Sequence, residues 1–194
     1  MTRPVAVAIT GGIGAGKSEA LAAFARRGAA TVSSDEIVHE LLRRDEVREQ
    51  LVERFGNGVV GPDGSLDRGA IATVVFNDPE ALAWLEALLH PLVAAEYLLW
   101  REQLAGLPNP PGVCVTEVPL LYETDAAGRF DKVVVITAPA GVRRARSEAA
   151  VEARERLLLP DEEKAARADY VYLNTGSLTE LEEFVGSVVN DLTG

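Results

Sequence analysis

The chain has 194 residues, of which 47% are hydrophobic, and a formal net charge of −11 at pH 7. This length and hydrophobic content are enough for one globular domain with a full core. The acidic balance disfavours nucleic acid as a partner, because binding along a phosphate backbone needs a basic face. The sequence has a single cysteine, Cys114, which excludes an internal disulfide and a cysteine-based zinc cluster.

The apolar segments favour a soluble protein. The run at residues 5–9 is too short for the hydrophobic part of a signal peptide, and it ends in glycines. No segment approaches the roughly 18 uninterrupted apolar residues of a membrane span. We therefore expect a cytoplasmic protein that keeps its N-terminus, binds a small ligand and has no membrane or nucleic-acid partner.

The N-terminal part of the chain alternates strands with helices. A short β-branched run at residues 5–9 predicts a parallel strand that is buried on both faces. A helix is expected at 17–27, where strong helix formers end in arginines and Gly28. A second strand at 29–32 and a helix at 36–44 follow, with Ser33, Ser34 or Asp35 as the helix cap.

The middle of the chain reads as helical. Helices are expected at 45–55, at 67–76 and from 77 or 78 to about 104, with a kink at Pro91. This stretch is too long for one crossover between strands, so we interpret it as an inserted acceptor-binding subdomain. After a proline-rich linker, strands are expected at 113–117, 132–137 and 170–173, and a last helix at 177–192. Strands alternating with helices predict a parallel sheet with right-handed crossovers.

The sequence GGIGAGKS, from Gly11 to Ser18, matches the pattern of a nucleoside triphosphate loop, and we call it the phosphate loop. Glycines let backbone N–H groups converge on phosphate oxygens, and the following helix N-terminus adds positive potential. Lys17 would reach the β- and γ-phosphates, and Ser18 would bind Mg²⁺. A dinucleotide-binding turn has no use for this Lys-Ser pair. The predicted ATP-binding residues are Gly12, Gly14, Ala15, Gly16, Lys17, Ser18 and Glu19.

A triphosphate loop does not by itself separate a GTPase, an ATPase motor and a small-molecule kinase. Guanine recognition in GTPases usually shows an Asn-Lys-x-Asp stretch, and the sequence has no Asn-Lys pair. DAAG, at residues 125–128, fits a GTPase pattern but lies several residues beyond the strand end expected at Glu117. Chance explains that match better, and a kinase is favoured.

Several motifs in order resemble the dephospho-coenzyme A kinase family. They are GGIGAGKS, SSDEIVHEL, FGNGVVGPDGSLDRGAI, FNDPEALAWLEALLHP, EVPLLYE and PDEEKAARADYVYLNTGSL, and they extend over nearly the whole chain. The resemblance implies transfer of the ATP γ-phosphate to the ribose 3′-hydroxyl of dephospho-coenzyme A, which completes coenzyme A. Its partners would be ATP and dephospho-coenzyme A, with Mg²⁺ as cofactor, in a monomer or small homo-oligomer.

The fold implied by the resemblance is a P-loop NTPase, a three-layer α/β/α protein with a five-stranded parallel sheet. Its core would comprise residues of about 1–35 and 112–194. A helical acceptor subdomain would span about 36–111, and a short lid about 142–163.

The family pattern also suggests roles for individual residues. Asp35, at the end of the second strand, would be the general base, and Glu117 would orient Mg²⁺ through water. Lys17 and a lid arginine, Arg144, Arg146 or Arg154, would stabilise the transferred charge. The adenine-side loop would contain Asn174 and Gly176. The acceptor-binding candidates are Asp35, His90, Pro119, Leu120, Leu121 and Glu123.

Two departures from the family pattern keep alternatives open. Ser33 replaces the first aspartate of a usual Asp-x-Asp, and Leu158 stands where glutamine is expected, in a lid that is shorter than usual. Asp35 could instead cap a helix, and His90 could satisfy backbone groups freed by Pro91. The alternatives to the main hypothesis are another P-loop nucleoside or nucleotide kinase, or a homologue that binds nucleotide without turnover.

Overall fold

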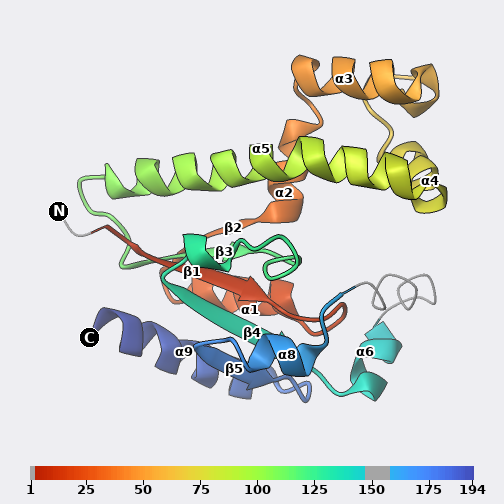
Figure 1. Ribbon diagram of the computed structural model, residues 1–194. Helices are drawn as coiled ribbons and strands as arrows, with labels where there is room; N and C mark the ends of the chain where they lie inside the picture. Colours follow the sequence, from red (N-terminus) through yellow and green to blue (C-terminus); the bar gives the residue numbers. More distant parts are fainter. Residues whose placement is uncertain (1–2, 147–157) are drawn as a thin grey trace. The chain divides into compact units, whose positions relative to one another are not determined.

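A five-stranded parallel sheet forms the centre of the first part of the protein (Figure 1). The computed structural model describes residues 3–146 and 158–194. The strand order is β2-β3-β1-β4-β5, and every neighbouring pair is parallel. The strands are β1 (Val5–Thr10), β2 (Ala30–Ser33), β3 (Val113–Glu117), β4 (Lys132–Thr137) and β5 (Tyr170–Leu173). The predicted α/β class and parallel sheet are confirmed.

Helices cover both faces of this sheet (Figure 1). On one face, α1 (Lys17–Arg26) and α9 (Leu178–Thr193) pack against alternate side chains of the central strands, including Val7, Ile9 and Val134. On the other face, Ala8 and neighbouring strand residues contact the loop after β3 and α8 (Asp161–Ala165). The short helices η2 (Ala127–Arg129) and α6 (Ala140–Arg146) follow β3 and β4. The three central strands β3, β1 and β4 are buried on both faces and are mostly apolar.

Contacts divide the chain into two compact units, residues 1–34 with 100–194 and residues 35–99. The second unit contains α3 (Asp45–Phe55), η1 (Asn57–Val59), α4 (Arg68–Asn77), most of α2 (Ser34–Leu41) and the first part of α5 (Pro79–Ala105). Its core is formed by Val47, Leu51, Ile71 and Leu89 with their neighbours. Asp67 caps α4 by accepting hydrogen bonds from the backbone N–H groups of Gly69 and Ala70.

Helix α5 runs without interruption through Pro91, where a kink was expected from the sequence. Proline removes one backbone hydrogen bond and clashes with the preceding turn, so this position weakens the helix without ending it. By length and composition α5 could span a membrane, with a mean hydropathy of 1.3 over its most apolar window. Of that window 17% is buried in the structure, and α5 contributes Ala81 and Leu89 to the core of the second unit.

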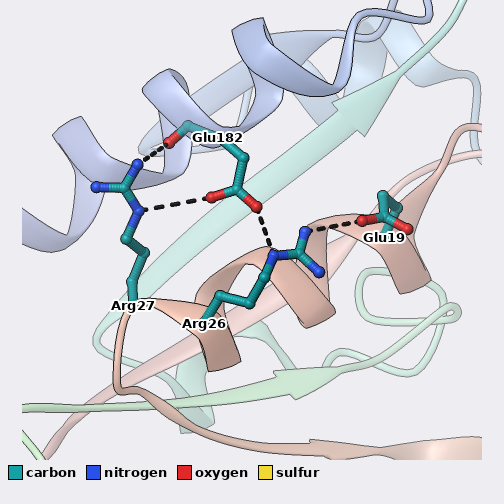
Figure 2. A network of polar contacts seen from close by, with 4 residues as sticks. All are labelled: Glu19, Arg26, Arg27 and Glu182. Carbon is teal, nitrogen blue, oxygen red and sulfur yellow. Dashed lines mark hydrogen bonds and ion pairs between the residues drawn. The ribbon is translucent and has the colours of Figure 1, made fainter.

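A network of charged side chains joins α1 to α9 (Figure 2). The Glu182 carboxylate lies between two arginines: its Oε1 is 2.6 Å from Arg26 Nε, and its Oε2 is 3.5 Å from Arg27 Nε. Arg26 also contacts Glu19, with 2.8 Å between Nη2 and Oε1. Arg27 Nη2 donates to the backbone carbonyl of Glu182 at 3.0 Å. One carboxylate on α9 therefore fixes the C-terminal end of α1.

We expect Glu182→Gln to lower the melting temperature at neutral pH and low salt. The hydrogen bond from Arg26 holds the pKa of Glu182 below its usual value. The stabilisation by this carboxylate is therefore present above the pKa that Glu182 has in the unfolded chain, and it is lost as the pH falls through the lower pKa of the folded protein. Thermal unfolding at about 0.05 M and about 1 M NaCl measures it, since salt screens exposed pairs. Glu183→Gln, on the exposed neighbour, is the control; equal behaviour of the two variants would contradict the prediction.

Cys114 should be unreactive in the folded protein. It is the second residue of β3 and has 2% of its surface exposed, and burial raises the pKa of its thiol to about 11. Because only the thiolate attacks disulfide reagents, labelling at about pH 8 should be far slower than in denaturant. The rate of Ellman's reagent with native and unfolded protein checks this; similar rates would show that β3 opens readily.

Candidate active site

The phosphate loop joins β1 to α1 through glycines in the left-handed region. Gly11, Gly14 and Gly16 have φ values of 139°, 74° and 98°, and Gly16 is the N-cap of α1. A Cβ on Gly11 would lie 2.0 Å from the carbonyl oxygen of Ile136 on β4. Position 11 therefore requires glycine, both because of its positive φ and because a side chain there would collide with β4. The loop brings the N-terminus of α1 to the end of the sheet, the arrangement that binds phosphate.

Three polar side chains gather at this end of the sheet. The Nζ of Lys17 donates to the carbonyl of Gly12 at 3.0 Å. The hydroxyl of Ser18 donates to Oε2 of Glu117 at 3.4 Å, and Glu117 is 6% exposed. Glu117 is the last residue of β3 and pairs in register with Ile9 of β1. The two residues predicted to bind Mg²⁺ therefore lie side by side, and a hydroxyl next to a carboxylate suits a hard cation.

The loop after β5 is tied directly to the phosphate loop. Asn174 is 6% exposed, and its amide donates to the carbonyl of Ala15 at 2.8 Å. Its side-chain oxygen accepts a hydrogen bond from the N–H of Gly176 at 2.9 Å. The structure thus joins the predicted adenine-side residues to the phosphate loop. Glu19, another predicted ATP-binding residue, instead has its carboxylate on Arg26 (Figure 2).

Arg143 and Asp161 lie at the phosphate loop, although the sequence analysis named neither. A Cβ built on Gly12 would be 2.8 Å from Arg143 Nη1 and 2.9 Å from Asp161 Oδ1. The two side chains form an ion pair of 3.8 Å between Nη1 and Oδ2. Consecutive side chains on a helix point about 100° apart, so the run of arginines in the sequence does not show which of them faces the phosphate loop.

The lid arginines of the sequence analysis are only partly within the described structure. The backbone of Arg144 and Arg146 belongs to α6, but their side chains lie outside the described residues. Arg154 lies entirely outside them.

A pocket of about 680 Å³ borders Gly12. Arg143 and Asp161 line the end near the phosphate loop, and Val171 and Leu173 of β5 contribute apolar walls. Leu158, where glutamine was expected, lines it as well.

The loop after β3 begins beside the end of β1 and leads to β4. The N–H of Val118 donates to the carbonyl of Ile9 at 2.8 Å, and the hydroxyl of Thr10 donates to the carbonyl of Pro119 at 3.2 Å. Pro119 and Leu120 are half-buried and remain acceptor-binding candidates.

Leu121 and Glu123, two further acceptor-binding candidates, both have their side chains engaged within the protein. Leu121 is 0% exposed and belongs to the core on the α8 face of the sheet, so its side chain packs inward, and its role in acceptor binding stays a prediction. Glu123 accepts a hydrogen bond from the N–H of Leu159 and pairs with Lys164. Its carboxylate is therefore directed to α8 and the residue before it.

Asp35 and His90 belong to the second unit. Asp35 is exposed in the first turn of α2, and His90 is half-buried within α5. Ser33, the last residue of β2, pairs in register with Glu117. Asp35 follows Ser33 by two residues along the chain.

Comparison with known proteins gives one consistent result. The sequence pattern of the dephospho-CoA kinase family matches residues 5–180. The dephospho-CoA kinase of Thermus thermophilus is 39% identical over 198 aligned positions, which cover 98% of this chain and 93% of the relative. That of Symbiobacterium thermophilum is 42% identical over 182 positions, which cover 89% and 74%.

Solved structures agree with this result. TT1252 from Thermus thermophilus superposes with a TM-score of 0.81 at 38% identity, over 100% of both chains. The dephospho-CoA kinase from Campylobacter jejuni gives 0.68 at 26% identity over 97% of each chain. Shikimate kinase from Aquifex aeolicus, at 15% identity, a TM-score of 0.55 and coverage of 98% and 100%, shares the P-loop kinase fold alone. From its sequence match at residues 5–180 and these full-length relatives, the chain belongs to the dephospho-CoA kinase family.

Proposed function

We propose that this protein transfers the γ-phosphoryl group of ATP to the ribose 3′-hydroxyl of dephospho-coenzyme A in the cytoplasm, giving coenzyme A and ADP. One observation carries this proposal: a complete phosphate loop stands in a chain whose relatives, matched over nearly full length, are dephospho-CoA kinases. A different nucleoside or nucleotide kinase has no such support.

The phosphate loop supplies the ATP site. Its backbone N–H groups and the N-terminus of α1 favour the β- and γ-phosphates. Lys17 is within reach of the same oxygens, since its Nζ already lies on the loop at Gly12. Asn174 holds the loop after β5 against Ala15, which supports its assignment to the adenine side.

The Ser18 and Glu117 pair fits Mg²⁺. The hydroxyl would bind the ion directly, and the carboxylate would hold one of its waters. Bound there, Mg²⁺ would neutralise charge on the β- and γ-phosphates. Glu117 is buried at the strand end, so it holds the Ser18 side chain in one orientation.

Asp35 is assigned as the general base. The acceptor hydroxyl attacks the γ-phosphorus in line, its proton passes to the Asp35 carboxylate, and the bond to the β-phosphate oxygen breaks to release ADP. The exposed position of Asp35 at the start of α2 leaves the carboxylate accessible to an acceptor. Catalysis of this kind depends on positioning and charge stabilisation.

Arg143 is added to Lys17, Arg144 and Arg146 as a residue that stabilises phosphoryl charge. Its guanidinium is adjacent to Gly12 and only 3.8 Å from Asp161. A guanidinium can exchange a carboxylate for a phosphate because both accept the same pair of N–H donors.

Purified protein incubated with MgATP and dephospho-coenzyme A should give a product heavier by one phosphate group. Adenosine and AMP, offered separately as acceptors, should give none. Mass spectrometry of the reaction mixtures measures this. Product from adenosine or AMP alone would identify a different kinase, and bound MgATP without any product would identify a nucleotide-binding homologue without turnover.

Replacing Asp35 by asparagine should lower kcat by about two orders of magnitude, because the hydroxyl loses its proton acceptor. MgATP affinity, measured by calorimetry, should be retained. Glu40→Gln, on another exposed carboxylate of α2, is the control and should leave kcat unchanged. Full turnover by the Asp35 variant would remove this residue from the mechanism.

A further inference from the structure

Helix α8 contains a lysine that is completely removed from solvent. Lys164 is 0% exposed, and its Nζ lies 2.8 Å from Oε1 of Glu123. A buried ammonium is costly unless an opposite charge neutralises it. The pair joins two segments that are distant in sequence, the loop after β3 and α8. Neither residue of this pair lies on the phosphate loop.

The same carboxylate oxygen holds a second group of the α8 segment. The N–H of Leu159 donates to Glu123 Oε1 at 3.0 Å. Leu159 immediately precedes Pro160, the N-cap of α8, and Lys164 lies near the end of that helix. Glu123 therefore fixes residues 159–164 at both ends.

The fixed segment carries Asp161, which reaches the phosphate loop. Its carboxylate pairs with Arg143 at 3.8 Å, and both side chains stand next to Gly12. A shift of the segment by about 1 Å would move the Asp161 carboxylate by a similar amount relative to Arg143. Placement errors of that size in phosphoryl-transfer sites are costly to turnover.

The other end of the connection is held at the end of β1, directly before the phosphate loop. The loop that carries Glu123 begins at Val118, which bonds to Ile9, and at Pro119, which accepts from Thr10. The contacts form a closed path from the end of β1, through Glu123 and Lys164, to Asp161 and Arg143 at Gly12. Stability alone does not require an ion pair here, because apolar residues of similar volume often stabilise a core equally well.

We propose that Glu123 and Lys164 are positioning residues for phosphoryl transfer, which hold residues 159–164 so that Arg143 and Asp161 meet the phosphate loop. Glu123 thus acts through the α8 segment rather than by contact with the acceptor. The inference rests on the proposed kinase function.

The test compares Glu123→Gln, Lys164→Met and the double variant with the parent enzyme. We expect kcat with dephospho-coenzyme A to fall about tenfold or more in each, with the KM of either substrate changed less than about threefold. The loss in the double variant should be smaller than the product of the two single losses, since both residues act through one connection. Lys132→Met is the matched control, because Lys132 also forms a 2.8 Å pair, with Asp169, at the opposite end of β4; its kcat should not change.

Melting temperatures separate positioning from stability. Each single variant leaves one buried group without its partner and should melt lower, whereas the neutral double variant should recover much of the parent's stability. If the double variant recovers kcat together with stability, the pair is merely structural and the inference is wrong. If Glu123→Gln raises the KM of dephospho-coenzyme A and Lys164→Met does not, Glu123 contacts the acceptor and the inference is also wrong.

Hydrogen exchange gives a readout that needs no turnover. Amides of residues 158–164 should exchange faster in Glu123→Ala and Lys164→Met than in the parent or Lys132→Met, because the segment loses its fixed position. Unchanged exchange would overturn the inference. If the parent enzyme is inactive toward dephospho-coenzyme A while hydrogen exchange in the variants changes as expected, the proposed function is wrong instead.

Discussion

The approach of Gly11 to the end of β4 is the constraint on which the site depends. With only 2.0 Å between a Cβ position and the Ile136 carbonyl, no other residue fits without separating β1 from β4. This contact lets the chain turn directly from β1 into α1. Lys17 and Ser18 then lie at the carboxyl ends of the strands, as Glu117 does. Lys17 donates to the carbonyl of Gly12, and Ser18 donates to Glu117.

The chain must bind highly charged phosphates although its own net charge is −11. The structure meets this locally: backbone N–H groups, Lys17 and Arg143 surround the loop, while Glu117 and Asp161 keep the polar side chains oriented. Each carboxylate contacts a neighbouring polar group: Glu117 accepts a hydrogen bond from the Ser18 hydroxyl, and Asp161 pairs with the Arg143 guanidinium. Overall charge is therefore a poor guide to the affinity of this site for anions.

The sequence predicted the strands and the phosphate loop well, because each has a local signature. The strands predicted at residues 113–117, 132–137 and 170–173 have the same bounds as β3, β4 and β5, and the Gly-Lys-Ser pattern located the loop. Arg143 was missed because a run of arginines does not reveal which one faces the loop. The burial of Leu121 and the identity of Lys164 as the partner of Glu123 could not be predicted from the sequence, since both depend on how distant segments pack. Contacts between segments that are distant in the chain leave no periodic pattern in the sequence.

In the proposed function, the bond between Lys17 and the carbonyl of Gly12 would affect the thermodynamics of phosphate binding. A long, flexible ammonium side chain normally loses considerable rotational freedom when it closes on an anion. Here the Nζ is already anchored to the loop it serves, so most of that entropy is lost when the protein folds. Preorganisation of this kind allows a single lysine to contribute a larger share of its electrostatic attraction to affinity.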